Sequence, residues 1–121
     1  SDDYMLMKGK PGATLEDLMQ GDSVPPIGRV EEIKASISRL FPSVRWEKGP
    51  ALPAGMSLPH GMNREAWFGL QGPAEFQLSV ESDGQVRMIT MSCCEKAEVE
   101  MVAKEFDVVA LDEQSMESFV G

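Results

Sequence analysis

The fold is decided by residues 75–91, which read EFQLSVESDGQVRMITM. Phe76, Leu78 and Val80 alternate with polar residues, which is the period of a strand with one buried face. Because Asp83-Gly84 suits the positive φ angles of a two-residue type I′ turn, we expect the chain to fold back there as a hairpin. The register that this turn imposes places Glu81 opposite Val86, Leu78 opposite Ile89 and Phe76 opposite Met91, with Val86 and Met88 on the other face of the hairpin.

Shorter strands are expected on both sides of this hairpin. Residues 67–70 precede it as a further strand, and Gly72-Pro73 makes the turn between them. Residues 4–8 and 44–47 also have short apolar patterns of strand type, and residues 108–111 form a buried apolar run. Residues 116–120 are expected to return as a short edge strand.

Helical periodicity appears in two stretches. Between residues 29 and 40, apolar side chains recur at spacings of three and four, at Val30, Ile33, Ile37 and Leu40. Ser92 and Glu95 have the spacing of a capping box, so a second helix is expected to start there. Its buried stripe comprises Val99, Val102, Ala103 and Phe106. A short third helix is expected near residues 14–21.

These elements predict an α+β fold in one domain that spans residues 1–121. The length of 121 residues fits a single domain. A mostly antiparallel sheet of about five or six strands, with two main helices packed on one face, is the simplest architecture for this order of elements.

Charge is the most uneven property of the chain. Twenty acids and 11 bases give a formal charge of −9. Residues 95–121 hold eight of the acids and two of the bases, which is −6 of that total. Such a surface repels a phosphate backbone, so we expect no nucleic acid, and it attracts a basic protein. Acidity that only keeps the domain soluble is the alternative.

Membrane and cofactor chemistry have little support in the sequence. No apolar run approaches the ~20 residues that span a bilayer. Cys93 and Cys94 are the only cysteines, which suits a reducing cytoplasm. Cys94 near a helix start could be reactive, but small spacers at a strand-to-helix junction explain both cysteines. We therefore expect no metal, no cofactor and no catalytic set.

The longest irregular stretch spans residues 49–63 and is rich in proline and glycine. It holds Met56, Met62 and the only histidine, His60. Loops of this length are often functional. Trp67 follows the loop, and an aromatic side chain beside flexible methionines suits a protein contact.

The C-terminal third, from Glu75 onward, resembles small uncharacterised bacterial α+β proteins. The shared pattern is strand, Asp-Gly turn, strand, helix, then a hydrophobic strand that ends in Asp112-x-Gln114, followed by Glu117 and Phe119. Such relatives sometimes accompany secreted toxins, so the resemblance implies an immunity or accessory role. It implies no catalytic residues.

The leading hypothesis is a non-enzymatic domain that binds a basic protein. The candidate partner-binding residues are Met56, His60, Met62, Trp67, Asp112, Glu113 and Glu117. One alternative is an enzyme or small-ligand-binding protein with a pocket under the 49–63 loop near His60. Another is a homodimer that pairs the exposed edge of the antiparallel strands, so both monomer and homodimer stay open.

Overall fold

The computed structural model describes residues 3–9, 25–50, 65–81, 83–112, 114–115 and 117–120. The short helix expected near 14–21 lies outside these residues, as does nearly all of the 49–63 loop. The helices within these residues are α2 (Val30–Leu40) and α3 (Lys96–Phe106). The strands are β1 (Asp3–Met7), β2 (Gly28–Arg29), β3 (Arg45–Pro50), β4 (Glu65–Gln71), β5 (Ala74–Val80), β6 (Gln85–Ser92), β7 (Val109–Asp112) and β8 (Ser118–Val120).

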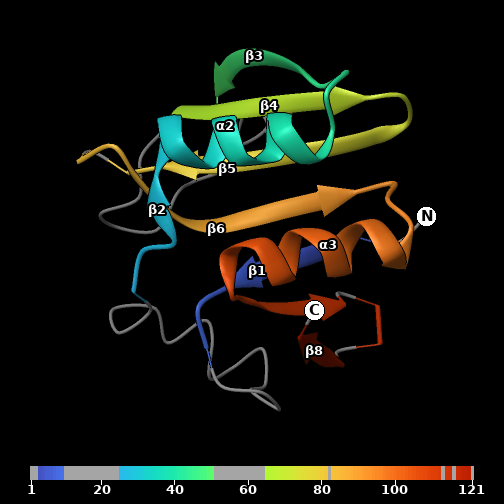
Figure 1. The fold of residues 1–121 in the computed structure, drawn as a ribbon. Coiled ribbons are helices and arrows are strands. Elements are labelled where there is room, and N and C mark those ends of the chain that lie inside the picture. Colours follow the sequence, from blue (N-terminus) through green and yellow to red (C-terminus); the bar gives the residue numbers. More distant parts are fainter. Residues whose placement is uncertain are drawn as a thin grey trace.

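The strands form one antiparallel sheet with the order β3-β4-β5-β6-β1-β7-β8, and β2 pairs with β6. The α+β class is therefore confirmed. The sheet has more strands than expected, partly because the two residues of β2 are too short for any periodic pattern. Strand β1 lies between β6 and β7, so α3 crosses over it to connect two parallel strands (Figure 1).

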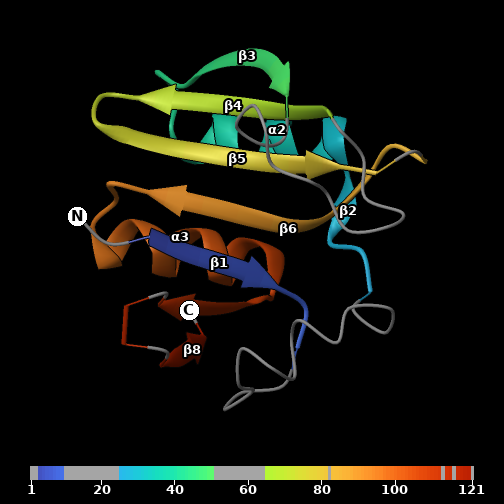
Figure 2. The ribbon, with the colours of Figure 1, turned by 180° about the vertical axis from the view of Figure 1, so that it is seen from behind.

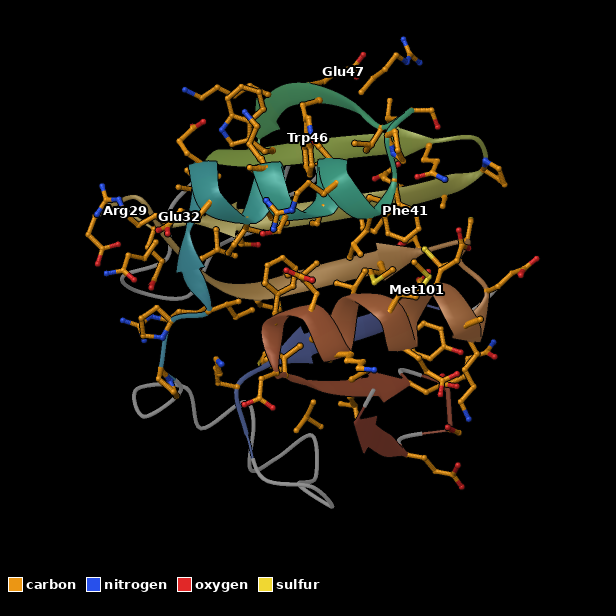
Figure 3. The ribbon with its side chains drawn as sticks, viewed as in Figure 1. Arg29, Glu32, Phe41, Trp46, Glu47 and Met101 are labelled. Carbon is orange, nitrogen blue, oxygen red and sulfur yellow. The ribbon has the colours of Figure 1, made fainter. Side chains whose placement is uncertain are left out.

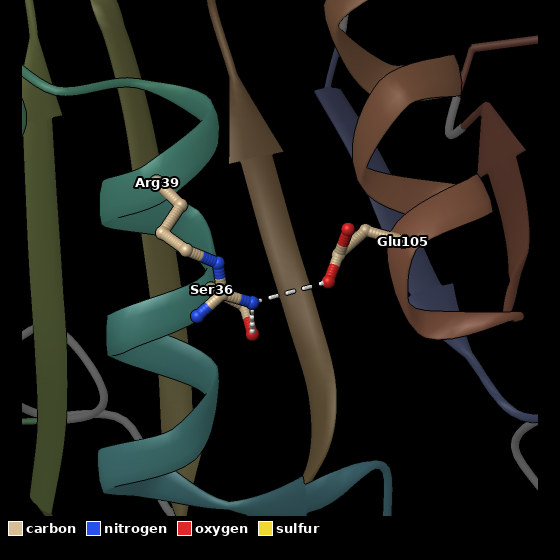
Figure 4. Close-up of polar contacts among 3 residues, drawn as sticks. All are labelled: Ser36, Arg39 and Glu105. Atoms are coloured by element: carbon tan, nitrogen blue, oxygen red, sulfur yellow. Dashed lines mark hydrogen bonds and ion pairs between the residues drawn. The ribbon is translucent and has the colours of Figure 1, made fainter.

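Both helices lie on the same side of the sheet in Figure 1, and in Figure 2 the strands stand in front of them. Ile33 and Ile37 of α2 and Val99, Val102 and Ala103 of α3 belong to one buried cluster with residues of β1, β5 and β6. The apolar stripes expected from the sequence are thus the faces that the helices bury. Arg39 of α2 and Glu105 of α3 also form an ion pair of 3.5 Å that crosses over β6 (Figure 4).

The hairpin differs from the expected register on one side. Leu78 pairs with Ile89 and Phe76 with Met91, as expected, but Val86 pairs with Val80 and not with Glu81. The amide of Glu81 donates to the carbonyl of Gln85, so three residues connect this pair where two were expected. Gly84 takes φ +83°, which suits the last position of such a loop.

A β-bulge between the Leu78 and Val80 pairs explains this shift. The extra residue on β6 allows Val86 and Ile89, three apart, to point to the same face. Both are fully buried in the main core. Burying one more valine contributes about 1.5–3 kcal/mol, more than the roughly 0.5–1.5 kcal/mol of a ladder hydrogen bond that the bulge disrupts.

The start of α3 also differs from the expectation. Cys93 has φ +57°, in the left-handed region, so the backbone cannot pass from Ser92 directly into a helix. The N-cap residue is Glu95, and the Oε1 atom of Glu98 accepts a hydrogen bond of 2.9 Å from its amide. The capping box is therefore Glu95 with Glu98, one turn after the Ser92–Glu95 box that the sequence suggested.

A second, smaller apolar cluster lies on the other face of the sheet. Met7 and Leu111 are buried, and Met5 and Met88 pack against them. Their neighbours in sequence, Leu6 and Ala110, belong to the main core. Strands β1 and β7 are thus buried on both faces, which accounts for their continuous apolar runs.

Candidate partner-binding surface

Four of the seven candidate residues, Met56, His60, Met62 and Glu113, lie outside the described residues. Trp67, Asp112 and Glu117 are described. The alternative site under the 49–63 loop also rests on residues that the structure does not describe.

Trp67 lies on β4, half-buried, and packs against the main core. It pairs with Leu78 and so points to the face that carries the helices. The ammonium group of Lys34 on α2 lies 3.4 Å from the centroid of its ring. Because a cation over the ring face is attracted by the ring quadrupole, this contact holds α2 to β4 and covers the Trp67 ring.

Trp46, the other tryptophan, is fixed beside Trp67. Its indole Nε1 donates a hydrogen bond of 3.0 Å to the hydroxyl of Ser38 on α2. Its ring lies over Gly69, where an added Cβ atom would be 2.8 Å from the ring (Figure 3). Neither tryptophan is therefore a free aromatic anchor, because each already has an intramolecular partner.

Asp112 closes the turn that joins β7 to β8. Its Oδ1 accepts hydrogen bonds from the amides of Gln114, at 2.9 Å, and Ser115, at 3.5 Å. Its own amide donates to the carbonyl of Glu117 at 2.9 Å. Asp112 therefore fixes the turn with its carboxylate, and it is only half-buried, while Glu117 is exposed.

Trp67 and Asp112 do not meet in the structure. Strand β4 is four strand spacings from β7 in the sheet order, which corresponds to about 19 Å. The sequence offered no means of seeing this, because strand order is set by long-range packing.

The structure instead places other acids beside Asp112 and Glu117. Tyr4 pairs with Asp112, which brings the preceding residue, Asp3, to the same end of the sheet. The start of β1, the first turn of α3 and the β7–β8 connection all lie at this end (Figure 1). We call the set formed there the acidic end: Asp3, Glu95, Glu98, Asp112 and Glu117.

The thiol of Cys94 reports the charge of this region. The pKa of Cys94 is raised to about 12, mainly by burial and in smaller part by the nearby carboxylates of Glu98 and Asp3. The thiol also lies 3.3 Å from the carbonyl oxygen of Ser92, to which it donates. Because the thiolate is the reactive form, Cys94 is not a nucleophile at neutral pH.

Asp3, Glu95 and Glu98 were absent from the candidates drawn from the sequence. Glu95 and Glu98 belonged to the acidic segment that the sequence singled out, and their positions near a helix start could have suggested them. Asp3 had no such signal, because only the pairing of β1 with β7 brings it there. One basic residue, Lys96, lies in the same region and is exposed.

No group of three or more His, Cys, Asp or Glu side chains within the described part of the chain is arranged to hold a metal ion. No helix in that part is long and apolar enough to cross a membrane. Comparison with protein-family models, with curated proteins and with solved structures gave no match.

Proposed function

We propose that this protein is a small acidic, non-enzymatic binding domain, of immunity or accessory type, whose acidic end contacts a basic protein. The observation that carries the proposal is the convergence of acids from three separate segments: β1, the start of α3, and the β7–β8 turn. Carboxylates gathered on one end of a molecule attract a basic partner and accelerate its association.

An apolar anchor lies next to these acids. Met101, on α3, is 44% exposed and is the only large apolar side chain of the described residues with such exposure (Figure 3). It follows Glu98 by three positions, so the two side chains are neighbours on the helix surface. An exposed methionine flanked by carboxylates provides the apolar centre and charged rim of a protein interface.

We assign the anchor to Met101 in place of Trp67, which the sequence favoured. Lys34 covers the ring of Trp67, and Trp67 lies about 19 Å from Asp112 by strand spacing. A partner that used Trp67 would first have to displace Lys34.

The test removes charge and keeps shape. The acidic-end variant carries Glu98→Gln, Asp112→Asn and Glu117→Gln, which preserve the oxygen acceptors that cap α3 and close the β7–β8 turn. The matched control carries Glu31→Gln, Glu32→Gln and Asp83→Asn. These control residues lie at the opposite end of the sheet, where the amide of Val30 donates to the carbonyl of Gly84.

Wild type and both variants would serve as bait for affinity capture from lysate of the source cells, at low and high salt. The proposal expects a basic protein that wild type and the control retain at low salt, and that the acidic-end variant loses. Equal retention by both variants, or equal loss from both, would contradict the assignment of the acidic end.

A further inference from the structure

Strand β3 forms one edge of the sheet, and β4 is its only strand neighbour among the described residues. Its side chains alternate between the faces. Trp46 pairs with Gly69, which pairs with Phe76 of the main core, so Trp46 points to the helix side. Arg45 and Glu47 therefore point to the other side. Both are exposed, and no ion pair of the described residues uses either of them.

We propose that this edge pairs antiparallel with the same edge of a second copy of the chain, around a two-fold axis through Trp46. A two-fold axis normal to the sheet keeps the helices of both copies on one side. Residues that face each other across the new ladder must then point to the same side.

The charges of β3 select this register. With the axis at Trp46, Arg45 lies opposite Glu47 of the second copy, and the same pair recurs on the other side of the axis. Trp46 lies opposite its own copy, so this axis places an uncharged residue opposite itself. An axis at Arg45, Glu47 or Lys48 would instead place that charged residue opposite itself.

Charged edge strands are common because they discourage indiscriminate pairing. On β3 the register centred on Trp46 brings opposite charges together across the axis. A register centred on a charged residue brings like charges together. The same pattern therefore opposes open aggregation and permits a closed dimer.

The distribution of the remaining charge also favours this edge. Strand β3 carries two basic residues, Arg45 and Lys48, and one acidic residue, Glu47. It is therefore locally positive, although the formal net charge of the chain is −9. Strand β7, at the acidic end, lies five strand spacings away, which is about 24 Å. The Debye length is ~8 Å at physiological salt, so the acidic ends of two copies are screened from each other.

The test is sedimentation equilibrium of wild type and three variants, at roughly 10 μM to 1 mM protein, because a short ladder gives a weak dimer. The singles are Arg45→Glu and Glu47→Arg, and the third variant combines them. Each single replaces two attractive pairs with two repulsive ones, so we expect the dissociation constant to rise about tenfold or more. The double restores opposite charges across the axis and should return dimerisation to near the wild-type level.

Circular dichroism would confirm that each variant is folded. A wild type that stays monomeric up to 1 mM would overturn the proposal, as would singles that dimerise as wild type does. A double variant that dimerises as weakly as the single variants would overturn the proposed register. All these variants keep the acidic end, so partner capture by that end fails or succeeds independently of this test.

Discussion

Replacing Gly69 with alanine tests the contact that fixes β3, β4 and α2 together. A Cβ atom at this position would lie 2.8 and 2.9 Å from two atoms of the Trp46 ring and 3.1 Å from Val44. Real Cβ atoms do not approach ring carbons so closely. The Trp46 ring would have to shift, and its hydrogen bond to Ser38 would be stretched or lost.

The expected loss of stability follows from three terms. Overpacking of a well-packed site costs about 1–3 kcal/mol. Loss of the indole hydrogen bond adds about 0.5–1.5 kcal/mol. Alanine in a strand recovers about 0.5–1 kcal/mol of backbone entropy relative to glycine. We therefore expect Gly69→Ala to lower the free energy of unfolding by about 0.5–4 kcal/mol, out of the 5–15 kcal/mol typical of a domain.

Urea unfolding followed by circular dichroism measures this change. Gly28→Ala is the matched control, because a Cβ atom there meets Ile33 at an ordinary 3.8 Å. In a Trp46→Leu background the penalty at Gly69 should be clearly smaller, since the ring that clashes is gone and only the 3.1 Å contact with Val44 remains. A Gly69→Ala protein whose unfolding free energy lies within about 0.5 kcal/mol of wild type would contradict the close contact between Gly69 and the Trp46 ring. Changes that small are typical of substitutions on the surface.

Three further predictions concern single side chains. Lys34→Ala should open the ring of Trp67 to acrylamide quenching of tryptophan fluorescence and lower stability by about 0.5–1 kcal/mol; unchanged quenching would contradict the cation–π contact. The pKa of Cys94 is raised from 9.0 to about 12, so the contribution of its thiol to stability is complete below pH 9 and is lost as the pH rises toward 12. The unfolding free energy of a Cys94→Ala protein should therefore decline less steeply with pH over that range than that of wild type. Equal slopes for the two proteins would contradict the raised pKa. Arg39→Ala should change stability by less than about 0.5 kcal/mol in thermal melts, because Arg39 and Glu105 are 67% and 34% exposed, and a larger loss would show that the pair matters more than its exposure implies.

Periodicity alone located the elements that carry the core. The stripe of Ile33 and Ile37 predicted α2, and the alternation of Phe76, Leu78 and Val80 predicted β5. These patterns succeed because burial acts on one face of an element and leaves its period in the sequence.

Local chemistry was less reliable where tertiary packing competed with it. Asp83-Gly84 indicated a two-residue turn, but the burial of Val86 favoured a longer loop and a bulge. Ser92 had the spacing of a capping residue, but the left-handed backbone of Cys93 delayed the helix until Lys96. In the hairpin a non-local contact, the burial of Val86, decided between two locally acceptable turns.

The candidate surface depended even more on long-range order. The acidic C-terminal segment was visible in the composition, but Asp3 joins it only through the pairing of β1 with β7. Trp67 was a reasonable candidate by residue type, yet the cation that covers it comes from α2, thirty-three positions earlier. Sequence patterns give the faces of elements, whereas the neighbours across elements require the sheet order.

The association rate constant of the captured partner shows whether the acidic end attracts it. It would be measured by stopped flow for wild type, the acidic-end variant and the matched control, at low and at physiological salt. The account predicts a rate lower by about threefold to tenfold for the acidic-end variant at low salt, a difference that shrinks as salt rises, and a control that matches wild type. Equal rates for all three proteins at low salt would contradict it.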